Sequence, residues 1–404
     1  MENKILVVGG ADTQIGLNII RSLGKKGLKV FCTGSSELAI GFFSKYTFKK
    51  FIVPYDQDKE KHFLDKIIKI IKQNSINCVF AISENITTTL NKKRKEIEKY
   101  AKLMVPEQIK FELVLNKRTT ISIAKKLNIP TPNTINIKNI HEIEKLDLNF
   151  PVVLKPSYHL YKNKSERNLD FKTKYVYSKE ELKEIMYQHQ KNKHFPLIQE
   201  YCRGSGIGIE ILMKNGKVLA IFQHNRIREY PPTGGVSTLR ESSKVNPKLK
   251  EYSVKLLKKI KWEGPAMVEF RYDKSTGNCA LMEVNGRFWG SLPLAIKSGV
   301  DFPYLFYRSH FENSLNNPLN QTYKFGLKCR QFWADTKWLL DMLFKQQPSL
   351  PDFKISKPKA ILEYLKSFNL STKYDVESLD DPLPGIVDWY TSLTKPLKNL
   401  FKQT

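Results

Sequence analysis

The stretch MEVNGRFWG (residues 282–290) decides how the rest of this chain is interpreted, together with MVEFRYD (residues 267–273) just upstream. Both stretches have the apolar and aromatic content of buried strands, yet they carry Glu269, Glu283 and Asn285. Burying an unpaired carboxylate in an apolar core is strongly unfavourable. We therefore expect a positively charged group to lie between these side chains.

The two stretches are expected to pair as neighbouring strands, because the turn residues KSTGN (274–278) separate them. Pairing would bring Glu269 and Glu283 side by side, with Asn285 on the same face as Glu283. Carboxylate and amide oxygens are hard ligands that suit Mg²⁺. A pair of edge-facing acids neutralised by lysines is the structural alternative, and three oxygen ligands in one register favour the metal.

The charge balance indicates an anionic partner or a strongly solvated surface. Lys and Arg number 67 against 40 Asp and Glu, a formal net charge of +27. Segments such as NKKRKEIEKYAK (91–102) mix both signs, as solvated helix faces do. The sequence has no RNA-binding, zinc-finger or helix-turn-helix signature, so a nucleic-acid partner is not expected. A small anionic substrate remains compatible with the charge.

Cysteine usage and hydropathy predict a cytoplasmic protein. The five cysteines are scattered and form no CxxC pair, which argues against a disulfide framework or a zinc site. A strand-like segment, KILVVGG (4–10), follows the first residues with no signal-peptide pattern before it. No apolar run approaches the roughly 20 residues that span a bilayer.

The first 110 residues or so have the alternating pattern of a doubly wound parallel sheet. The expected strands are 4–9, 28–34, 51–56 and 76–83, with helices at 13–27 and 61–74. The glycines of GGADTQIG (9–16) do not match the dinucleotide fingerprint GxGxxG, so a structural turn is favoured over a cofactor site.

From about residue 135 the pattern changes to α+β, and after about 310 it becomes helical. The expected strands are 150–156, 195–202, 208–225, 266–273 and 279–287. The turns KNGK (214–217) and KSTGN indicate hairpins, so much of this sheet should be antiparallel. Helices are expected at 331–346 and 386–401.

The last of these helices carries an apolar stripe with lysines beside it. The stripe consists of Ile386, Trp389, Tyr390, Leu393, Leu397 and Leu400, flanked by Lys395, Lys398 and Lys402. Such a stripe usually packs against the body of the protein. Peripheral contact with the inner membrane face is the more specific alternative. A homodimer contact is a third candidate, and Pro396 weakens the helix in each case.

Two lysines are placed where phosphates could bind. Lys155 interrupts the apolar strand VVLKP (152–156), and a buried ammonium needs an anion. Lys117, in LNKRTT (115–120), begins a helix. Both could reach the phosphates of one nucleotide. The strand end in LIQEYCRG (197–204) offers the free backbone groups that an adenine edge needs.

The order Lys117, Lys155, IQEYCRG, MVEF, MEVNGR resembles the ATP-grasp superfamily, in particular its carbamoyl-phosphate-synthase-like branch, from residue 1 to about 310. The resemblance implies an α/β and α+β fold with a doubly wound parallel-sheet pre-ATP-grasp domain, a two-subdomain ATP-grasp fold and a helical C-terminal extension. The corresponding ranges are 1–112 for the first domain, 113–205 for the small nucleotide-binding subdomain with its linker, 206–312 for the catalytic, metal-binding subdomain and 313–404 for the extension.

The resemblance also implies ATP and Mg²⁺ (or Mn²⁺) as cofactors, with a role for each matching residue. Lys117 and Lys155 would contact phosphates, Gln199 the adenine amino group, and Glu200, Tyr201 and Cys202 would form the backbone hinge. Glu269, Glu283 and Asn285 would hold the metal, and Arg287 would stabilise the transferring phosphoryl group.

Two departures from the family pattern stand out. The loop over the phosphates is usually glycine-rich, whereas residues 156–175 contain no glycine, so lysines and Arg167 would have to replace backbone amides. No carboxylate obviously takes the ribose hydroxyls, and Glu210 is the available stand-in.

The segment FQHNRIREYPPTGGVSTLRESS (222–243) predicts a substrate site. His224, Arg226 and Arg228 alternate along a strand, so all three could converge on one anionic substrate, with the arginines in catalytic positions. A basic outer face is the alternative. A further substrate contact is expected from Gly234, Gly235 and Ser237, whose backbone amides could bind a carboxylate.

We expect an ATP-dependent carboxylate–amine (or thiol) ligase that acts through an acyl phosphate, in cell-envelope precursor or peptide biosynthesis. The alternatives are a non-catalytic protein that uses the same fold to bind polyanions or membrane, and a ligase that adds amino acids to a protein tail.

Overall fold

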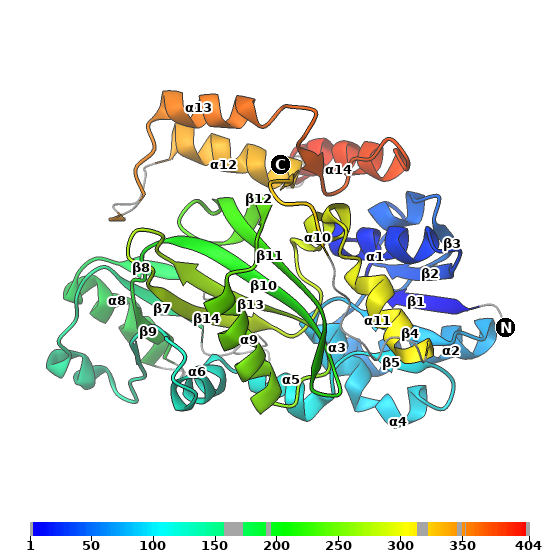
Figure 1. The fold of residues 1–404 in the computed structure, drawn as a ribbon, viewed down its shortest axis with the longest axis horizontal. Helices are drawn as coiled ribbons and strands as arrows, with labels where there is room; N and C mark the ends of the chain where they lie inside the picture. Colours follow the sequence, from blue (N-terminus) through cyan, green and yellow to red (C-terminus); the bar gives the residue numbers. More distant parts are fainter. Residues whose placement is uncertain are drawn as a thin grey trace.

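The computed structural model describes residues 3–156, 173–190, 195–312, 322–345, 350–351 and 353–400, with residues 395–400 as backbone only. The described strands form three sheets (Figure 1). The predicted glycine-free loop, including Arg167, lies almost wholly outside the described residues, as do the side chains of Lys395, Leu397, Lys398, Leu400 and Lys402.

The N-terminal sheet is parallel throughout, in the order β3-β2-β1-β4-β5, as the alternating pattern predicts. Its strands are β1 Lys4–Val8, β2 Lys29–Gly34, β3 Thr47–Ile52, β4 Cys78–Ala81 and β5 Lys102–Met104, and its helices are α1 Gln14–Gly24, α2 Glu60–Asn74, α3 Glu84–Lys92 and α4 Arg94–Ile97. Short 3₁₀ turns occupy Ile40–Phe43 and Gln57–Lys59. The third strand was expected at 51–56, but it ends at Ile52, shortly before Pro54, which has no N–H to donate to a neighbouring strand.

The glycine turn after β1 packs tightly. A Cβ atom on Gly16 would lie 2.0 Å from the carbonyl oxygen of Gly10, so only glycine lets α1 approach β1 this closely. Thr13 caps α1 by accepting a hydrogen bond from the Gly16 amide. The turn therefore has a structural role in joining strand to helix.

A four-stranded antiparallel sheet, ordered β6-β9-β7-β8, follows in the chain. The elements of this part are α5 Gln108–Leu115, α6 Lys117–Lys126, β6 Thr134–Ile135, the 3₁₀ turn Ile140–Lys145, β7 Val152–Lys155, β8 Lys174–Val176, α8 Lys179–Gln190 and β9 Leu197–Glu200. Apolar side chains from α8 and from one face of the sheet share one buried cluster. Because β9 lies between β6 and β7, it is an inner strand, and its ladder pairing ends at Glu200.

The largest sheet has the order β14-β13-β10-β11-β12-β15-β16. Its strands are β10 Ser205–Lys214, β11 Lys217–Tyr230, β12 Val236–Ser243, β13 Gly264–Tyr272, β14 Cys279–Asn285, β15 Lys328–Arg330 and β16 Lys373–Tyr374. The accompanying helices are α9 Pro247–Lys259, α10 Leu292–Ser298, α11 Phe302–Phe311, α12 Phe332–Phe344, α13 Lys357–Lys366 and α14 Leu383–Leu400. Asn215 and Gly216, both with positive φ, form the tight β10–β11 turn that the motif KNGK predicts.

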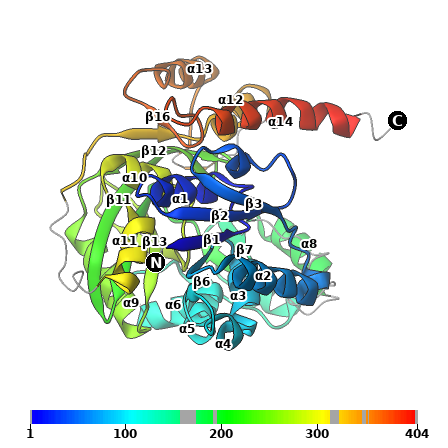
Figure 2. The ribbon, with the colours of Figure 1, turned by 90° about the vertical axis from the view of Figure 1, so that its right-hand side faces the viewer.

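The C-terminal part forms a helical layer over the body, at the top of Figure 1 and again in the view turned by 90° (Figure 2). It is mainly helical, as expected, and its two short strands β15 and β16 extend the large sheet. α14 continues through Pro396 to Leu400. Within the described residues, no helix is both long and apolar enough to cross a bilayer.

Buried ion pairs attach this layer to the rest of the chain. The Asp335 carboxylate on α12 accepts hydrogen bonds from Arg228 at 2.6 and 2.7 Å and from Arg330 at 2.6 Å. Arg240 pairs with Asp375, and Arg21 on α1 pairs with Asp381 at 2.9 Å. Removing one partner of such a pair strongly destabilises the fold, because the remaining charge stays buried without a partner.

We predict that Asp335→Ala lowers the free energy of unfolding by about 3–5 kcal/mol, since it strands Arg228 and Arg330 in the interior. Asp341→Ala is the matched control, because Asp341 lies on the same helix and pairs with the largely exposed Lys345. Urea unfolding followed by circular dichroism measures both. Equal, small losses in the two variants would contradict the structural role of Asp335.

Candidate active site

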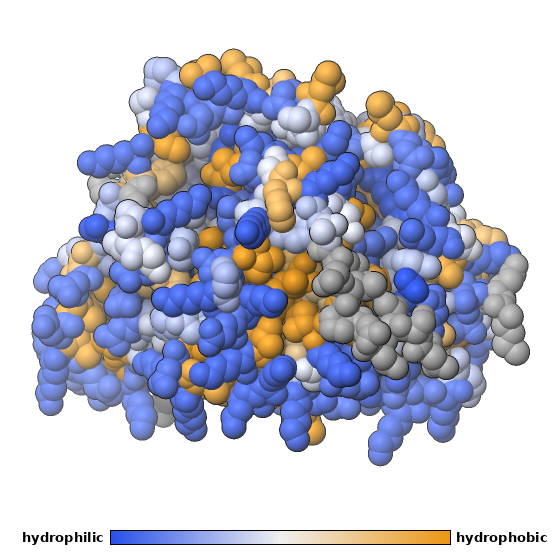
Figure 3. Space-filling model, viewed as in Figure 1, coloured by the Kyte–Doolittle hydropathy of each residue, from blue (hydrophilic) through white to orange (hydrophobic). Residues whose placement is uncertain are grey.

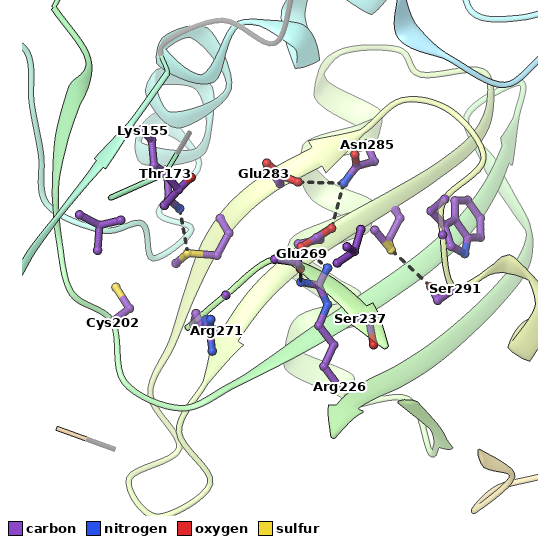
Figure 4. A pocket seen from close by; sticks show the side chains of 18 of the residues that line it. Lys155, Thr173, Cys202, Arg226, Ser237, Glu269, Arg271, Glu283, Asn285 and Ser291 are labelled. Atoms are coloured by element: carbon purple, nitrogen blue, oxygen red, sulfur yellow. Dashed lines mark hydrogen bonds and ion pairs between the residues drawn. The ribbon is translucent and has the colours of Figure 1, made fainter. Parts of the chain in front are cut away.

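The carboxylates that the sequence singled out lie on paired strands, as expected. Glu269 in β13 stands directly opposite Glu283 in β14, and Asn285 stands opposite Met267. The Asn285 amide nitrogen donates to Glu269 Oε1 at 3.0 Å and to Glu283 Oε1 at 3.1 Å (Figure 4). The three side chains therefore form one oxygen-rich cluster at the wall of a cavity of about 500 Å³.

Two cations neutralise this cluster. Lys117, at the start of α6, lies 2.9 Å from Glu283 Oε2, and Arg226 of β11 contacts Glu269 Oε2. Arg226 is held in place by Glu229 Oε1 at 3.0 Å and by the carbonyl oxygen of Gly235 at 3.1 Å. These contacts explain how two carboxylates can face each other in a largely buried strand pair.

The donor set fits a hard divalent cation. Two carboxylates and one amide oxygen suit Mg²⁺, and the two ends of an amide exchange by rotation of the side chain. Within the described residues no group of three or more His, Cys, Asp or Glu side chains could hold a metal by itself. Such a cation would therefore need phosphate oxygens as additional ligands, which Mg²⁺ commonly uses in nucleotide sites.

Lys155 lies in the same cavity, and within the described residues it forms no ion pair. Its Nζ is 3.8 Å from the sulfur of Met282. Burial, and after it the nearby charge of Lys117, lower the pKa of this amine to about 8. An ammonium held this way gains most from an incoming anion, which is the environment that a phosphate-binding lysine needs.

The end of β9 forms another wall. Gln199, Glu200, Tyr201 and Cys202 all line the cavity. The Gln199 side chain donates to Thr134 Oγ1 at 3.0 Å, while its Oε1 is buried and has no hydrogen-bond partner among the described residues. A buried acceptor of this kind fits an amino group on a ligand, such as that of adenine.

His224, Gly234, Gly235 and Ser237, which the sequence assigns to a substrate site, also line the cavity. The His224 ring is fully buried, and its Nδ1 lies 2.9 Å from Glu210 Oε1. Burial, with Arg226 and Arg240 nearby, lowers the pKa of His224 well below its usual value, so the imidazole is neutral. Glu210 is itself fully buried and also accepts from Ser291 at 2.7 Å, so the expected contact with ribose hydroxyls does not fit its position.

Arg228 does not join His224 and Arg226, contrary to the prediction that the three converge. Register shifts on both sides of Arg228 interrupt the pairing of β11 with β12, so the alternation of side chains is lost there. Arg228 turns instead to Asp335, Ser367 and the carbonyl oxygen of Glu363, with its guanidinium 4.9 Å from the ring centre of Trp338. Its surroundings indicate a structural role under the C-terminal helices.

Arg287 links the cavity to the N-terminal domain. Its Nε lies 3.3 Å from Glu84 Oε1 at the start of α3, and its Nη1 donates to the carbonyl oxygen of Phe288. The guanidinium lines the same cavity as the carboxylate cluster. It is therefore placed where it could neutralise charge that develops on a phosphoryl group.

Several residues of the cavity were not predicted, among them Gln14, Tyr175, Arg271 and Gln331. Arg271 could have been found, because it lies two residues after Glu269 and so faces the same side of β13. It donates to Glu229 Oε2 at 3.2 Å and to the carbonyl oxygen of Gly204 at 3.0 Å. Gln14 and Gln331 come from distant parts of the chain, and only the tertiary structure brings them here.

Comparison with known proteins identifies the fold. Residues 193–331 match the family model described as ATP-grasp in the biosynthetic pathway with Ter operon. The carbamoyl phosphate synthase large chain of Clostridium botulinum is 23% identical over 323 residues, which cover 73% of this chain and 28% of the relative. The chain thus spans little more than a quarter of the curated relatives it matches.

Over residues 193–331 the chain belongs to the ATP-grasp superfamily. Among solved structures, the L-amino acid ligase from Bacillus licheniformis is 18% identical with a TM-score of 0.59, covering 77% of this chain and 74% of the other. The biotin carboxylase from Campylobacter jejuni, solved as a beta-gamma-ATP complex, is 16% identical with a TM-score of 0.64, covering 81% and 74%. The shared ATP-grasp fold agrees with the parallel N-terminal sheet, the antiparallel sheets and the helical C-terminal part described above.

We predict that binding of a phosphate-bearing ligand such as ADP to this cavity weakens as pH rises above about 8. Below that pH the Lys155 ammonium is already charged, whereas above it binding must first restore the proton. Isothermal titration calorimetry in buffers of different ionisation enthalpy should show proton uptake near pH 9 and none near pH 7. Lys155→Met should bind more weakly at pH 7 and show no uptake; uptake that survives in this variant would assign the proton to another group.

Proposed function

We propose that this chain is an ATP-dependent carboxylate–amine ligase. The observation that carries the proposal is the joint placement of Glu269, Glu283 and Asn285 with Lys117 and Lys155 in one cavity. This set combines oxygen ligands for a divalent cation with ammonium groups for phosphates. The buried, unpaired Oε1 of Gln199 supports adenine as the base, because it lacks a donor within the described residues.

In the proposed reaction a substrate carboxylate oxygen attacks the γ-phosphorus of ATP and ADP leaves. An amine nitrogen then attacks the acyl carbon, phosphate leaves, and the nitrogen loses a proton as the amide forms; a thiol would react in the same way. Mg²⁺ (or Mn²⁺), when bound, would neutralise phosphate oxygens. The protein itself contributes position and charge, which supply most of the catalysis in phosphoryl transfer.

Each cation of the cavity has a proposed task. Lys155 and Lys117 orient the phosphates, and Lys117 can exchange its contact with Glu283 for one with the nucleotide. Arg287, anchored by Glu84, stabilises charge on the transferring phosphoryl group. Because Glu84 belongs to α3, this role would couple the N-terminal domain to the reacting centre.

An anionic substrate is proposed for the part of the cavity near β11 and β12. Arg226 and Arg271 both reach this part, and Gly234 and Gly235 provide backbone groups beside them. The neutral His224 adds a ring nitrogen, Nε2, that is buried without a hydrogen-bond partner among the described residues. Free amino acids are the first substrates to test, in view of the similar L-amino acid ligase, and nucleotide-linked cell-envelope precursors are the second.

We predict that the purified chain releases ADP and phosphate from Mg-ATP only with one pool of substrates, and that Glu283→Ala lowers this release by about 100-fold or more. A coupled assay of ADP release with pools of amino acids, of cell-envelope precursors and of peptides measures it. Glu251→Ala, on the exposed face of α9, is the matched control and should retain activity.

Absence of ADP release with every pool, together with no change of melting temperature on adding Mg-ATP, would contradict the proposal. That result would favour a non-catalytic protein that binds polyanions on an ATP-grasp fold. Turnover with a peptide pool alone would favour addition of amino acids to a protein tail.

A further inference from the structure

The outer surface of the C-terminal layer exposes an unusual number of large apolar side chains. They are Leu340, Phe344, Ile361, Leu362, Leu365, Phe368, Leu370, Leu379, Leu383, Ile386, Trp389, Tyr390 and Leu393. Leu370 and Leu379, on the segments that flank β16, are as exposed as in an extended peptide, at 99% and 102%. Figure 3 shows apolar groups along the top of the molecule, over the layer that Figure 1 places there.

Several of these side chains adjoin one another. The Phe332 ring stacks on Trp389 of α14 with centroids 4.6 Å apart, and lies 6.3 Å from Phe368, which follows α13. Next to it runs an open groove of about 570 Å³ whose walls include Leu379, Ile386 and Trp389. We call this surface, from α13 through Phe332 to α14, the C-terminal apolar face. Contiguous apolar surfaces of this kind mark interaction sites in soluble proteins.

Lysines are interleaved with the apolar side chains. Lys366 follows Leu365 directly, and the Lys373 ammonium lies 3.5 Å from the carbonyl oxygen of Leu370. Lys357 and Lys359 are exposed in the first turn of α13. Figure 3 shows hydrophilic groups between the apolar ones along this edge. Apolar groups that can enter a bilayer, beside lysines that stay at the headgroups, are typical of proteins that lie on anionic membranes.

The face is also attached to the body by hydrogen bonds and an ion pair. Asp381, two residues after Leu379, pairs with Arg21 of α1 and accepts from Ser44 at 2.7 Å. The carbonyl oxygen of Asp375, which follows β16, accepts from Asn18 at 2.8 Å. Leu370 and Leu379 thus project from anchored segments, so that inserting them into a bilayer would order little additional chain.

We propose that the C-terminal apolar face docks on the surface of an anionic lipid bilayer. Among the described residues no helix could span the bilayer, so the contact is peripheral. A second copy of the chain is the less suitable occupant. In a two-fold symmetric contact the same face meets itself, which would bring the lysines of one copy against those of the other in a chain of net charge +27. This proposal is independent of the proposed ligase activity.

Docking places a soluble reaction beside a membrane. The cavity with Glu269 and Glu283 lies in the body, and α12 contributes Ala334 to its lining while the same helix exposes Leu340 and Phe344 toward solvent. A membrane-bound chain would therefore hold its cavity beneath the layer that contacts lipid. The class of substrate this favours is one made or consumed at the bilayer surface.

The test is co-sedimentation of the purified full chain with vesicles. We expect binding to vesicles that contain phosphatidylglycerol, weaker binding at high salt, and little binding to vesicles of phosphatidylcholine alone. Leu370→Ser with Leu379→Ser should weaken binding at least about tenfold. Lys366→Ala with Lys373→Ala should weaken it about 25-fold, roughly fivefold for each lysine removed.

Matched controls distinguish docking through this face from non-specific adsorption to vesicles and from misfolding. Ile109→Ser removes another exposed apolar side chain, 80% exposed on α5, and Lys125→Ala with Lys126→Ala removes two exposed lysines of α6. All variants change exposed side chains, and their melting temperatures should match that of the parent chain. Binding should be unchanged in both controls.

Vesicle binding that is equal in the leucine variant and in Ile109→Ser would overturn the proposal. So would no binding to anionic vesicles together with a dimer, seen by light scattering, that the leucine substitutions dissociate; a second copy would then be the occupant. Because vesicle binding needs no ATP, failure here would leave the ligase proposal to its own assay.

Discussion

The antiparallel register of β13 and β14 is the constraint on which the candidate site depends. It sets Glu269 directly opposite Glu283 on neighbouring strands, where like charges repel unless something neutralises them. The neutralising groups come from far away in the chain, Lys117 from the start of α6 and Arg226 from β11. The fold therefore brings α6 and β11 to the strand pair, where their cations neutralise the two carboxylates. The same carboxylates could bind a metal cation, and the same cations could bind phosphates.

The large excess of basic residues has distinct consequences in different places. Inside the molecule, Arg21, Arg228, Arg240 and Arg330 are partners for aspartates of the C-terminal segment, and these pairs join the sheet, the N-terminal domain and the helical layer. In the cavity, burial lowers the pKa of Lys155 to about 8, and a bound anion would stabilise its ammonium form. On the outside, lysines surround apolar side chains. The excess of basic residues thus includes side chains with structural, ligand-binding and surface roles.

The same buried ion pairs attach the C-terminal layer to the elements that line the cavity. Asp335 lies one residue after Ala334, which lines the cavity, and it holds Arg228 and Arg330 from beneath. Asp375 and Asp381 attach the next segments to β12 and to α1. The surface proposed to dock on a membrane is therefore joined by buried ion pairs to the sheet that carries the carboxylates.

Local pattern alone determined much of this protein. Alternating strands and helices gave the parallel N-terminal sheet, the Asn215–Gly216 turn gave a hairpin, and the spacing of Glu269, Glu283 and Asn285 gave a shared strand face, because each depends on neighbours a few residues apart. Only the tertiary structure decided the rest. The interrupted register at Arg228 turned that side chain toward Asp335, over a hundred residues away, and Gln14 and Gln331 reached the cavity from opposite ends of the chain. Alternation predicts where a side chain points only while the pairing is regular, and a partner for a buried charge can come from any part of the chain that the fold brings near.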